Sequence, residues 1–429
     1  MSELALLGGR PVRTRGFPAW PRPTPRDRAR LQEVLESGNW GGHPFPNRLA
    51  REFSSKFAAY HGASYGCCVA NGTIALVAAL QAAGIRYGDE VIVPAYTWDG
   101  TAGAVLYAGG VPVFADIDPD TYCLDVASAR RAVTPRTRAI IPVHLAMRFA
   151  GMEAVLALAS EYGLKVIEDC AHAHGGAYNG RGAGSMGDLG CFSFQSSKIM
   201  ACGEGGAVIT SRLEIFEVLQ SIVNCGRASE TGRFHRRIVG SNYRMTEFQA
   251  ALLLGQLEEL PKLAARRARH AALLTRELAG IPGISPLPPQ PAITREAIYN
   301  YVFRYRRPEA SRDLFAAALD REGIPCDGRF YEAVYRSDLF QVNPADFPQV
   351  GDRDYAACRC PAAERAAYDE SVWLPHFLLL GDENDVEDIV RAVRKVIAHL
   401  GELAGVDPAL AGVKSMSRAE RSKAERKNY

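Results

Sequence analysis

YGCCVANGTIALVAALQAAGIRYGDEVIVPAYTWDGTAGAVLYAGGVPVFADI, residues 65–117, is the stretch that decides the fold. Short apolar runs alternate in it with two segments of helical pattern, at 74–85 and 101–110. Strands of a parallel sheet have this nearly continuous apolar character, because helices cover both faces of such a sheet. The stretch therefore predicts an α/β fold with a mostly parallel sheet between helices.

The same alternation continues toward the C-terminus and then gives way to a smaller domain. A long helical pattern extends from Thr246 to about Leu278, after which YNYVFRY (299–305) suggests an α+β lobe closed by a helix within 386–400. The last sixteen residues carry six basic and two acidic groups and few large apolar ones, a composition typical of disorder. We expect an N-terminal arm over residues 1–20, a large domain over 21–262, a small C-terminal domain over 263–404 and a disordered basic tail over 405–429.

Composition excludes several classes of function. The formal charge of +2 over 429 residues gives no electrostatic basis for binding nucleic acid, and no apolar run is long enough to span a membrane. Ten scattered cysteines do not form the dense framework of a small secreted domain. We expect a cytoplasmic protein with reduced thiols and small-molecule partners.

Polar residues that follow the predicted strands are the candidates for a ligand site, because open α/β sheets bind ligands at the carboxyl ends of their strands. Gly72 and Thr73 start a helix directly after the first run, which suits an anion, although a plain Asn-Gly cap would look the same. Trp98 follows the second run and could stack on a flat ring or lie in the core.

Two further strand ends carry ionisable groups. KVIEDCAHAHGG (165–176) ends in Glu168 and Asp169, with His172 close behind, and CFSFQSSKIMACGEGG (191–206) holds Lys198 between Ser193 and a glycine-rich turn. Pyridoxal phosphate (PLP) needs a carboxylate paired with its pyridine nitrogen and a lysine amine that reacts with its aldehyde. Alternatively, the acids are hydrogen-bonded structural groups and the lysine is a surface charge. A metal site is not expected, since no zinc-like spacing recurs.

Two other patterns are easily misread. Residues 182–187 match GxGxxG, but the motif precedes a strand instead of following one, so a dinucleotide site is not expected. GSNYRMTEFQAALL (240–253) is by itself only a polar turn with Asn242 and Arg244 before a helix that Thr246 caps.

Taken in order, NGT, the Trp-containing strand end, EDCAHAHG, FSFxxxK, GEGG and GSNYRMTEFQAA resemble the DegT/DnrJ/EryC1/StrS family of sugar and cyclitol aminotransferases, over roughly residues 15–400. The resemblance implies a fold type I PLP enzyme, a homodimer with shared active sites, and amino transfer from glutamate or glutamine to a polyhydroxylated ketone. It also implies the roles of the site residues: Lys198 as the Schiff-base lysine and proton carrier, Asp169 as the pyridine partner, Trp98 stacked on the ring, His172 as a cofactor neighbour, Gly72, Thr73 and Ser193 around the phosphate, and Asn242 reaching the phosphate in the other subunit.

Departures from the family pattern leave the substrate open. The usual HLYG reads HLAM at 144–147, and Arg244 stands where many inosose aminotransferases have Cys. In contrast, CGR (225–227), RFHRRIVGSNYRMTEF (233–248), RCP (359–361) and SVWLPH (371–376) look more like the 3-amino-5-hydroxybenzoate (AHBA) synthase branch. A dehydratase and aromatase of that type is the alternative to transamination, and a catalytically silent PLP-fold sensor is a third. Retained Lys198 argues against the sugar dehydratases that carry His instead. Acceptor contacts are predicted from polar aromatic and basic side chains in loops, namely Trp40, His43, Arg244, Tyr331, Tyr335 and His376.

Overall fold

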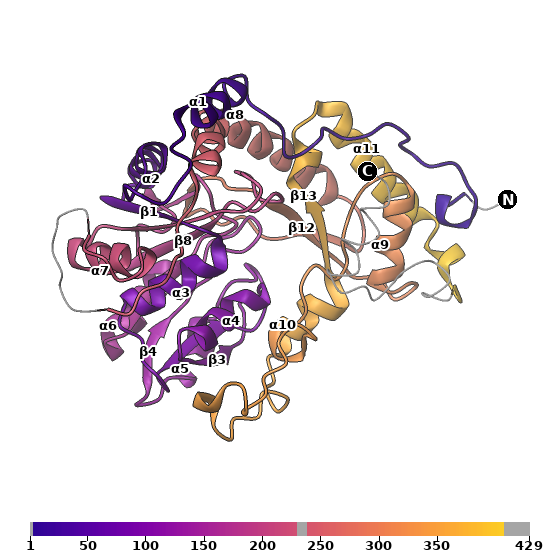
Figure 1. The fold of residues 1–429 in the computed structure, drawn as a ribbon. Helices are drawn as coiled ribbons and strands as arrows, with labels where there is room; N and C mark the ends of the chain where they lie inside the picture. Colours follow the sequence, from indigo (N-terminus) through magenta and orange to yellow (C-terminus); the bar gives the residue numbers. More distant parts are fainter. Residues whose placement is uncertain (1–2, 230–237, 407–429) are drawn as a thin grey trace.

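A seven-stranded sheet forms the centre of the large domain in the computed structural model, which describes residues 3–229 and 238–406 (Figure 1). Its strand order is β1-β9-β8-β5-β4-β2-β3, and every strand is parallel to the others except β9, which is antiparallel to both neighbours. The α/β prediction is confirmed. The strands are β1 (Tyr65–Val69), β2 (Glu90–Pro94), β3 (Val111–Ala115), β4 (Thr137–Ile140), β5 (Lys165–Asp169), β8 (Leu189–Ser193) and β9 (Gly206–Thr210).

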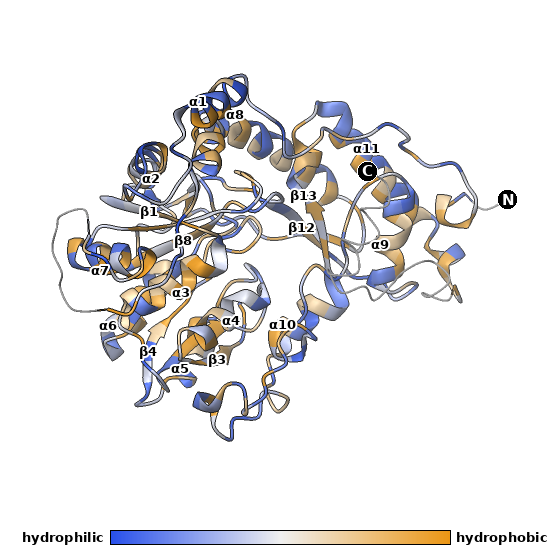
Figure 2. Ribbon diagram, viewed as in Figure 1, coloured by the Kyte–Doolittle hydropathy of each residue, from blue (hydrophilic) through white to orange (hydrophobic). Residues whose placement is uncertain are grey.

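Helices cover both faces of this sheet, as the apolar runs require. Successive strand residues face opposite sides, so Val91 and Val93 pack in one hydrophobic cluster while Ile92 packs in the other. The first cluster includes α3 (Gly72–Ala82), α4 (Asp99–Tyr107) and α7 (Leu213–Val223). The second includes α2 (Arg48–His61), α5 (Val126–Arg131), α6 (Met152–Tyr162) and part of α8 (Glu247–Leu278). The hydropathy colouring follows this arrangement: α3 is largely apolar, whereas the outer helices are mixed (Figure 2).

The C-terminal lobe is built on a three-stranded antiparallel sheet in the order β10-β12-β13. Helix α8 continues through Pro261 without a break, so the boundary expected at 262/263 falls inside one helix that both lobes share. The other elements of this part of the chain are β10 (Ile284–Pro286), β11 (Ile293–Arg295), β12 (Asn300–Tyr305), β13 (Ser371–Pro375), α9 (Arg312–Arg321), α10 (Pro361–Arg365) and α11 (Glu383–Ala398). Strand β11 pairs with β6 (Ala177–Tyr178), which also pairs with β7 (Arg181–Gly182).

The N-terminal arm crosses the C-terminal lobe before the chain enters α1 (Asp27–Ser37), as the indigo trace in Figure 1 shows. Buried Arg13 anchors it through ion pairs of 2.8 Å to Asp385 and Asp388 of α11. The predicted tail lies outside the described residues from position 407 onward. Within the described ranges, none of the helices combines the length and the apolar character that crossing a membrane requires.

Candidate functional site

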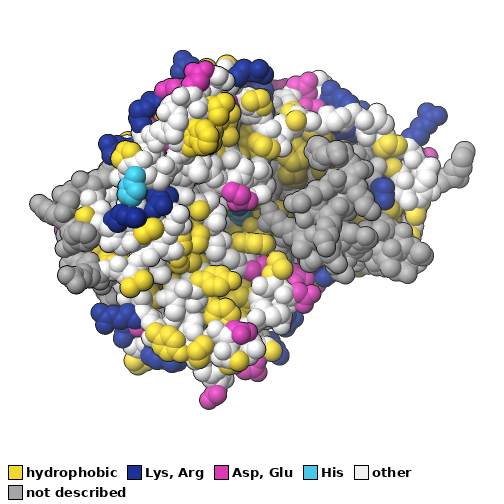
Figure 3. Space-filling model, in the orientation of Figure 1, with side chains coloured by type: hydrophobic (Ala, Val, Ile, Leu, Met, Phe, Trp, Pro, Cys, Tyr) yellow, Lys and Arg dark blue, Asp and Glu magenta, His cyan; other side chains and the backbone are white. Residues whose placement is uncertain are grey.

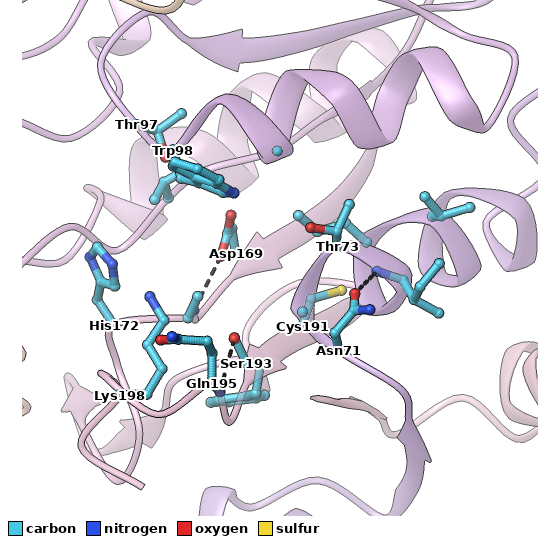
Figure 4. A pocket seen from close by; sticks show the side chains of 18 of the residues that line it. Asn71, Thr73, Thr97, Trp98, Asp169, His172, Cys191, Ser193, Gln195 and Lys198 are labelled. Atoms are coloured by element: carbon cyan, nitrogen blue, oxygen red, sulfur yellow. Dashed lines mark hydrogen bonds between the residues drawn. The ribbon is translucent and has the colours of Figure 1, made fainter. Parts of the chain in front are cut away.

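A cavity of about 730 Å³ lies where the carboxyl ends of β1, β2, β5 and β8 meet. This is the size range of small-molecule and cofactor sites, and the position is the one expected for open α/β sheets. Figure 4 shows the Lys198 amine and the Asp169 carboxylate pointing into one space, with the Trp98 ring above it and Thr73 to its right. Among the predicted site residues, the cavity brings together Gly72, Thr73, Trp98, Asp169, His172, Ser193, Lys198 and Tyr331.

Lys198 is buried, with 8% of its surface exposed, so it is not the ordinary surface lysine that its sequence neighbours allow. Its backbone N–H donates to the Gln195 carbonyl at 2.8 Å in the turn that follows β8. The Nζ atom lies 4.3 Å from the centre of the Tyr299 ring, over the face of that ring. A lysine held in this way has a fixed direction of approach to anything bound in the cavity.

The Asp169 carboxylate is also buried, at the last position of β5. Its Oδ2 accepts a hydrogen bond of 2.9 Å from the Thr101 hydroxyl, and its Oδ1 accepts one of 3.1 Å from the Ala171 N–H. Burial raises the pKa of Asp169, while these two hydrogen bonds and the positive charge of Lys198 act against that rise. A cation or a protonated ring nitrogen in the cavity would stabilise the carboxylate further.

Glu168, the neighbouring acid, points to the opposite face of β5 and is fully engaged there. Its carboxylate accepts hydrogen bonds of 2.6–2.9 Å from the backbone N–H groups of Gly184, Met186 and Gly187 and lies 3.0 Å from His144 Nε2. The GxGxxG loop thus wraps a protein carboxylate, which explains its glycines without a nucleotide. His144 and Cys170 lie near this carboxylate, with the ligand atoms of the three residues within 4.8 Å of one another.

His172 belongs to the wall of the cavity. Its Nδ1 accepts from the Ala146 N–H at 3.2 Å, and its Nε2 lies 3.2 Å from the Tyr331 hydroxyl. Its ring stacks on Tyr299 with 4.0 Å between centroids. His174, in contrast, supports β8 from behind: its Nε2 is 2.7 Å from the Ser193 carbonyl, and burial lowers its pKa to about 3.

The start of α3 forms a polar corner of the cavity. Asn71 caps the helix, because its side-chain oxygen accepts from the Ile74 N–H at 2.9 Å. A Cβ atom at Gly72 would lie only 2.5 Å from the Cβ of Ser193, so the helix start and the end of β8 approach as closely as a glycine permits. Helix N-termini favour bound anions, and this corner also offers the Thr73 and Ser193 hydroxyls.

Six of the predicted residues lie outside this chain's cavity. Arg244 donates to Asn224 at 3.0 Å, Tyr335 donates to Glu364 at 2.6 Å, and His43 and Asn242 are exposed loop residues. Trp40 is 51% exposed and packs on Phe248 at the start of α8.

His376 also lies outside the cavity, buried behind the Lys198 turn. Its surface is 2% exposed, and its Nε2 lies 3.2 Å from the Ser197 carbonyl.

The sequence-based prediction missed several residues that shape the site. Thr101 lies one helical turn after Trp98, a spacing that could have pointed to it. Tyr299 and Trp20 come from segments distant in the sequence and carried no local signal. Gln195, which lines the cavity, stands inside the quoted FSFQSSK motif and could have been included.

Comparison with known proteins gives one consistent result. Residues 22–394 match the model of the DegT/DnrJ/EryC1/StrS aminotransferase family. A Streptoalloteichus tenebrarius protein with the provisional name L-glutamine:3-amino-2,3-dideoxy-scyllo-inosose aminotransferase is 46% identical, over 94% of this chain and 99% of its own. The L-glutamine:2-deoxy-scyllo-inosose aminotransferase of Micromonospora echinospora is 37% identical, over 94% and 100%. Among solved structures, AHBA synthase superposes with a TM-score of 0.81 at 34% identity, over 90% and 100% of the two chains.

Proposed function

Because this chain belongs to the DegT/DnrJ/EryC1/StrS aminotransferase family, we propose that it is a PLP-dependent aminotransferase that moves the amino group of L-glutamine to the ketone of a cyclitol. The relatives named above support both the donor and the acceptor class, since their names specify L-glutamine and scyllo-inosose derivatives. A keto-sugar acceptor and glutamate as donor are the alternatives within the same reaction class.

One observation carries the proposal: buried Lys198 and buried Asp169 face the same cavity. PLP fits the groups present there. Asp169 would pair with the pyridine nitrogen, the Trp98 ring would lie against the ring face, and the corner at Gly72, Thr73 and Ser193 would hold the phosphate. The close approach at Gly72 supports this fit, because a side chain there would fill the corner.

When bound, PLP supplies an electron sink that makes the proton on the amine-bearing carbon removable. Lys198 would first hold the cofactor covalently, and its freed Nζ would then take that proton and return it to the carbon on the other side of the amine nitrogen. Asp169 would keep the ring nitrogen protonated, which its raised pKa does not prevent, because a cationic partner favours the carboxylate. The same groups would act in reverse on the acceptor ketone, giving ping-pong kinetics.

Hydroxyl groups of a cyclitol would find several polar partners in the cavity. Tyr331, Gln195, Thr97 and Glu204 line it together with His172. Alcohol, amide and carboxylate groups can each donate to or accept from ring hydroxyls. We propose further acceptor contacts from residues outside this cavity, which a second subunit or the substrate itself would bring together with it: Trp40, His43, Arg244 and Tyr335.

We propose a homodimer in which Asn242 reaches the phosphate in the partner's site. Asn242 is exposed and lies outside its own chain's cavity, while its neighbour Tyr243 lines that cavity. Large hydrophobic side chains are exposed beside the site: Trp98 is 38% exposed and Tyr107 is 67% exposed, and both line the cavity. Figure 3 shows hydrophobic side chains gathered around the hollow on this face. A second subunit would cover such groups.

The test is spectroscopic. Purified protein loaded with PLP should absorb visible light, and L-glutamine alone should remove that absorbance within a turnover time. Addition of 3-amino-2,3-dideoxy-scyllo-inosose or 2-deoxy-scyllo-inosose should restore it and give an amine product identified by mass. The Lys198→Ala variant serves as the control for covalent attachment. A spectrum unchanged by both glutamine and glutamate would rule the proposal out.

The likeness to AHBA synthase supports a second candidate, a PLP-dependent dehydratase and aromatase. Such an enzyme would convert an aminodehydroshikimate-like substrate into a product with aromatic ultraviolet absorbance. The higher identity to the inosose relatives favours transamination. An aromatic product formed in the absence of any amino donor would reverse that preference.

A further inference from the structure

Arg267, in the middle of α8, is a fully buried guanidinium with an exposure of 0%. Its Nη1 and Nη2 have no hydrogen-bond partner among the described residues. Burial and the nearby positive charge of Arg22 lower its pKa to about 9. A buried charge without a compensating carboxylate is costly, so its presence calls for a role in what surrounds it.

The groups that Arg267 does contact lead directly to the lysine turn. Its Nε donates to His376 Nδ1 at 3.2 Å, and its guanidinium carbon lies 5.2 Å from the centre of the Trp20 ring. His376 Nε2 is 3.2 Å from the Ser197 carbonyl, and Trp20 Nε1 donates to the Lys198 carbonyl at 2.9 Å. Two consecutive backbone carbonyls at the lysine are thus held by two side chains that share one guanidinium.

The guanidinium also fixes the tautomer of His376. Arginine can only donate, so the Nδ1 atom of His376 must be the acceptor and cannot carry a proton. The single proton of the neutral imidazole is then on Nε2, where it is needed to donate to the Ser197 carbonyl. Burial and the charge of Arg267 lower the pKa of His376 well below its ordinary value, which keeps the ring in this form.

We propose that Arg267, His376 and Trp20 are positioning residues that hold the Lys198 turn in its reactive orientation, with Arg267 selecting the His376 tautomer. The three residues come from α8, the start of the small 3₁₀ turn after β13, and the N-terminal arm, so the turn is fixed between both lobes and the arm. This inference rests on the proposed function, in which Lys198 Nζ both holds PLP and moves a proton.

The experiment uses the PLP-loaded full chain, four single variants, one double variant and an exposed control variant. His376→Leu and Arg267→Met should each lower kcat roughly 10- to 100-fold, with the KM for L-glutamine changed less than threefold, because a misplaced lysine slows proton transfer more than substrate binding. The visible circular dichroism of bound PLP should weaken in both. The double variant should be no slower than either single one, since both remove the same link.

Two variants separate positioning from general support of the fold. His376→Gln should recover most of the activity lost in His376→Leu, because its amide can accept from Arg267 and donate to Ser197. Trp20→Phe keeps an aromatic six-membered ring but removes the five-membered ring with its Nε1 donor to the Lys198 carbonyl, so it should lower kcat and alter the dichroism even if Arg267→Met does not fold. Arg269→Met, in the same helix but exposed, is the control and should match the parent protein.

The outcomes distinguish the two proposals. Borohydride reduction and peptide mass analysis show whether PLP is attached to Lys198 in the parent protein. Absence of that adduct overturns the proposed function and this inference together. If the adduct forms but Trp20→Phe and His376→Leu keep the parent kcat and dichroism, the inference alone is wrong. A His376→Gln variant as impaired as His376→Leu would also overturn it.

Discussion

Gly72→Ala tests whether the close contact between α3 and β8 shapes the cofactor corner. The backbone at Gly72 does not have the positive φ that would itself disfavour alanine, so the effect is steric. The new methyl group would lie 2.5 Å from Ser193 Cβ and 3.0 Å from Ser193 Oγ. Carbon atoms pack at about 3.5–4.0 Å, so the helix start or the strand end must move by about 1 Å.

Overpacking of this kind typically costs about 1–3 kcal/mol. If the displaced groups are the ones that hold the phosphate, that energy is taken from cofactor binding and the Kd for PLP rises about 5- to 150-fold. Equilibrium dialysis of the apoprotein with PLP, read by absorbance, measures this change. Gly151→Ala is the matched control, because a Cβ there meets no atom within 4 Å and its φ is −68°.

A compensating variant makes the test sharper. Ser193→Gly removes both of the shortest contacts and leaves one of 3.2 Å to the Ser193 Cα. Added to Gly72→Ala, it should recover part of the lost affinity, although Ser193→Gly alone weakens binding by removing a hydroxyl. Unchanged affinity in Gly72→Ala, or a double variant with purely additive losses, would refute the reasoning that this contact sets the corner.

Three further predictions follow from the same geometry. Asp169→Asn should slow the half-reaction with L-glutamine roughly 100-fold or more, because a neutral amide cannot hold the ring nitrogen protonated; an unchanged rate of absorbance loss would contradict this. Burial lowers the pKa of His61 from 6.5 to about 3, so the unfolded state binds the extra proton and stability should fall as pH drops from about 6.5 toward 3, by up to about 1.4 kcal/mol per pH unit. Urea unfolding at several pH values should show that the free energy of unfolding depends less steeply on pH in His61→Gln. An identical dependence would assign the loss of stability at low pH to other groups. Lys198→Ala and Asn242→Ala subunits, each impaired alone, should regain about a quarter of the parent activity when mixed as exchanging dimers, and no gain would place Asn242 outside the partner's site.

Local sequence patterns were sufficient for most elements of the fold, but not for the order of the strands. Each apolar run became a strand close to its expected bounds, because burial on both faces leaves a direct mark on composition. Strand β9 lies between β1 and β8 and runs antiparallel to both, although it comes last of the seven in the sequence. Such an insertion depends on contacts between distant segments, which no local periodicity encodes.

In the candidate site, too, local sequence patterns pointed to some residues and contacts between distant segments determined the others. Lys198 and Asp169 could be selected because their chemistry and their places at strand ends point to one cofactor. The residues that support them could not: Tyr299 under the Lys198 amine and Trp20 on its carbonyl lie about a hundred or more positions away in the sequence. His376 was predicted to contact the acceptor, yet it is buried behind the lysine turn, because a polar ring in a loop has the same local pattern in either role.

Glu168 and Asp169 show what decides between two equivalent candidates. The residues are adjacent at the end of one strand, so their side chains must face opposite sides of the sheet. One side holds the GxGxxG loop, whose three N–H groups leave Glu168 no free capacity for a ligand. The other side holds the cavity, where the Asp169 carboxylate accepts from the Thr101 hydroxyl and the Ala171 N–H and faces the space in which a cationic partner would bind. The assignment of the pyridine partner therefore depends on strand register. Glu168→Gln should lower the free energy of unfolding without slowing the half-reaction with L-glutamine in the protein that still folds.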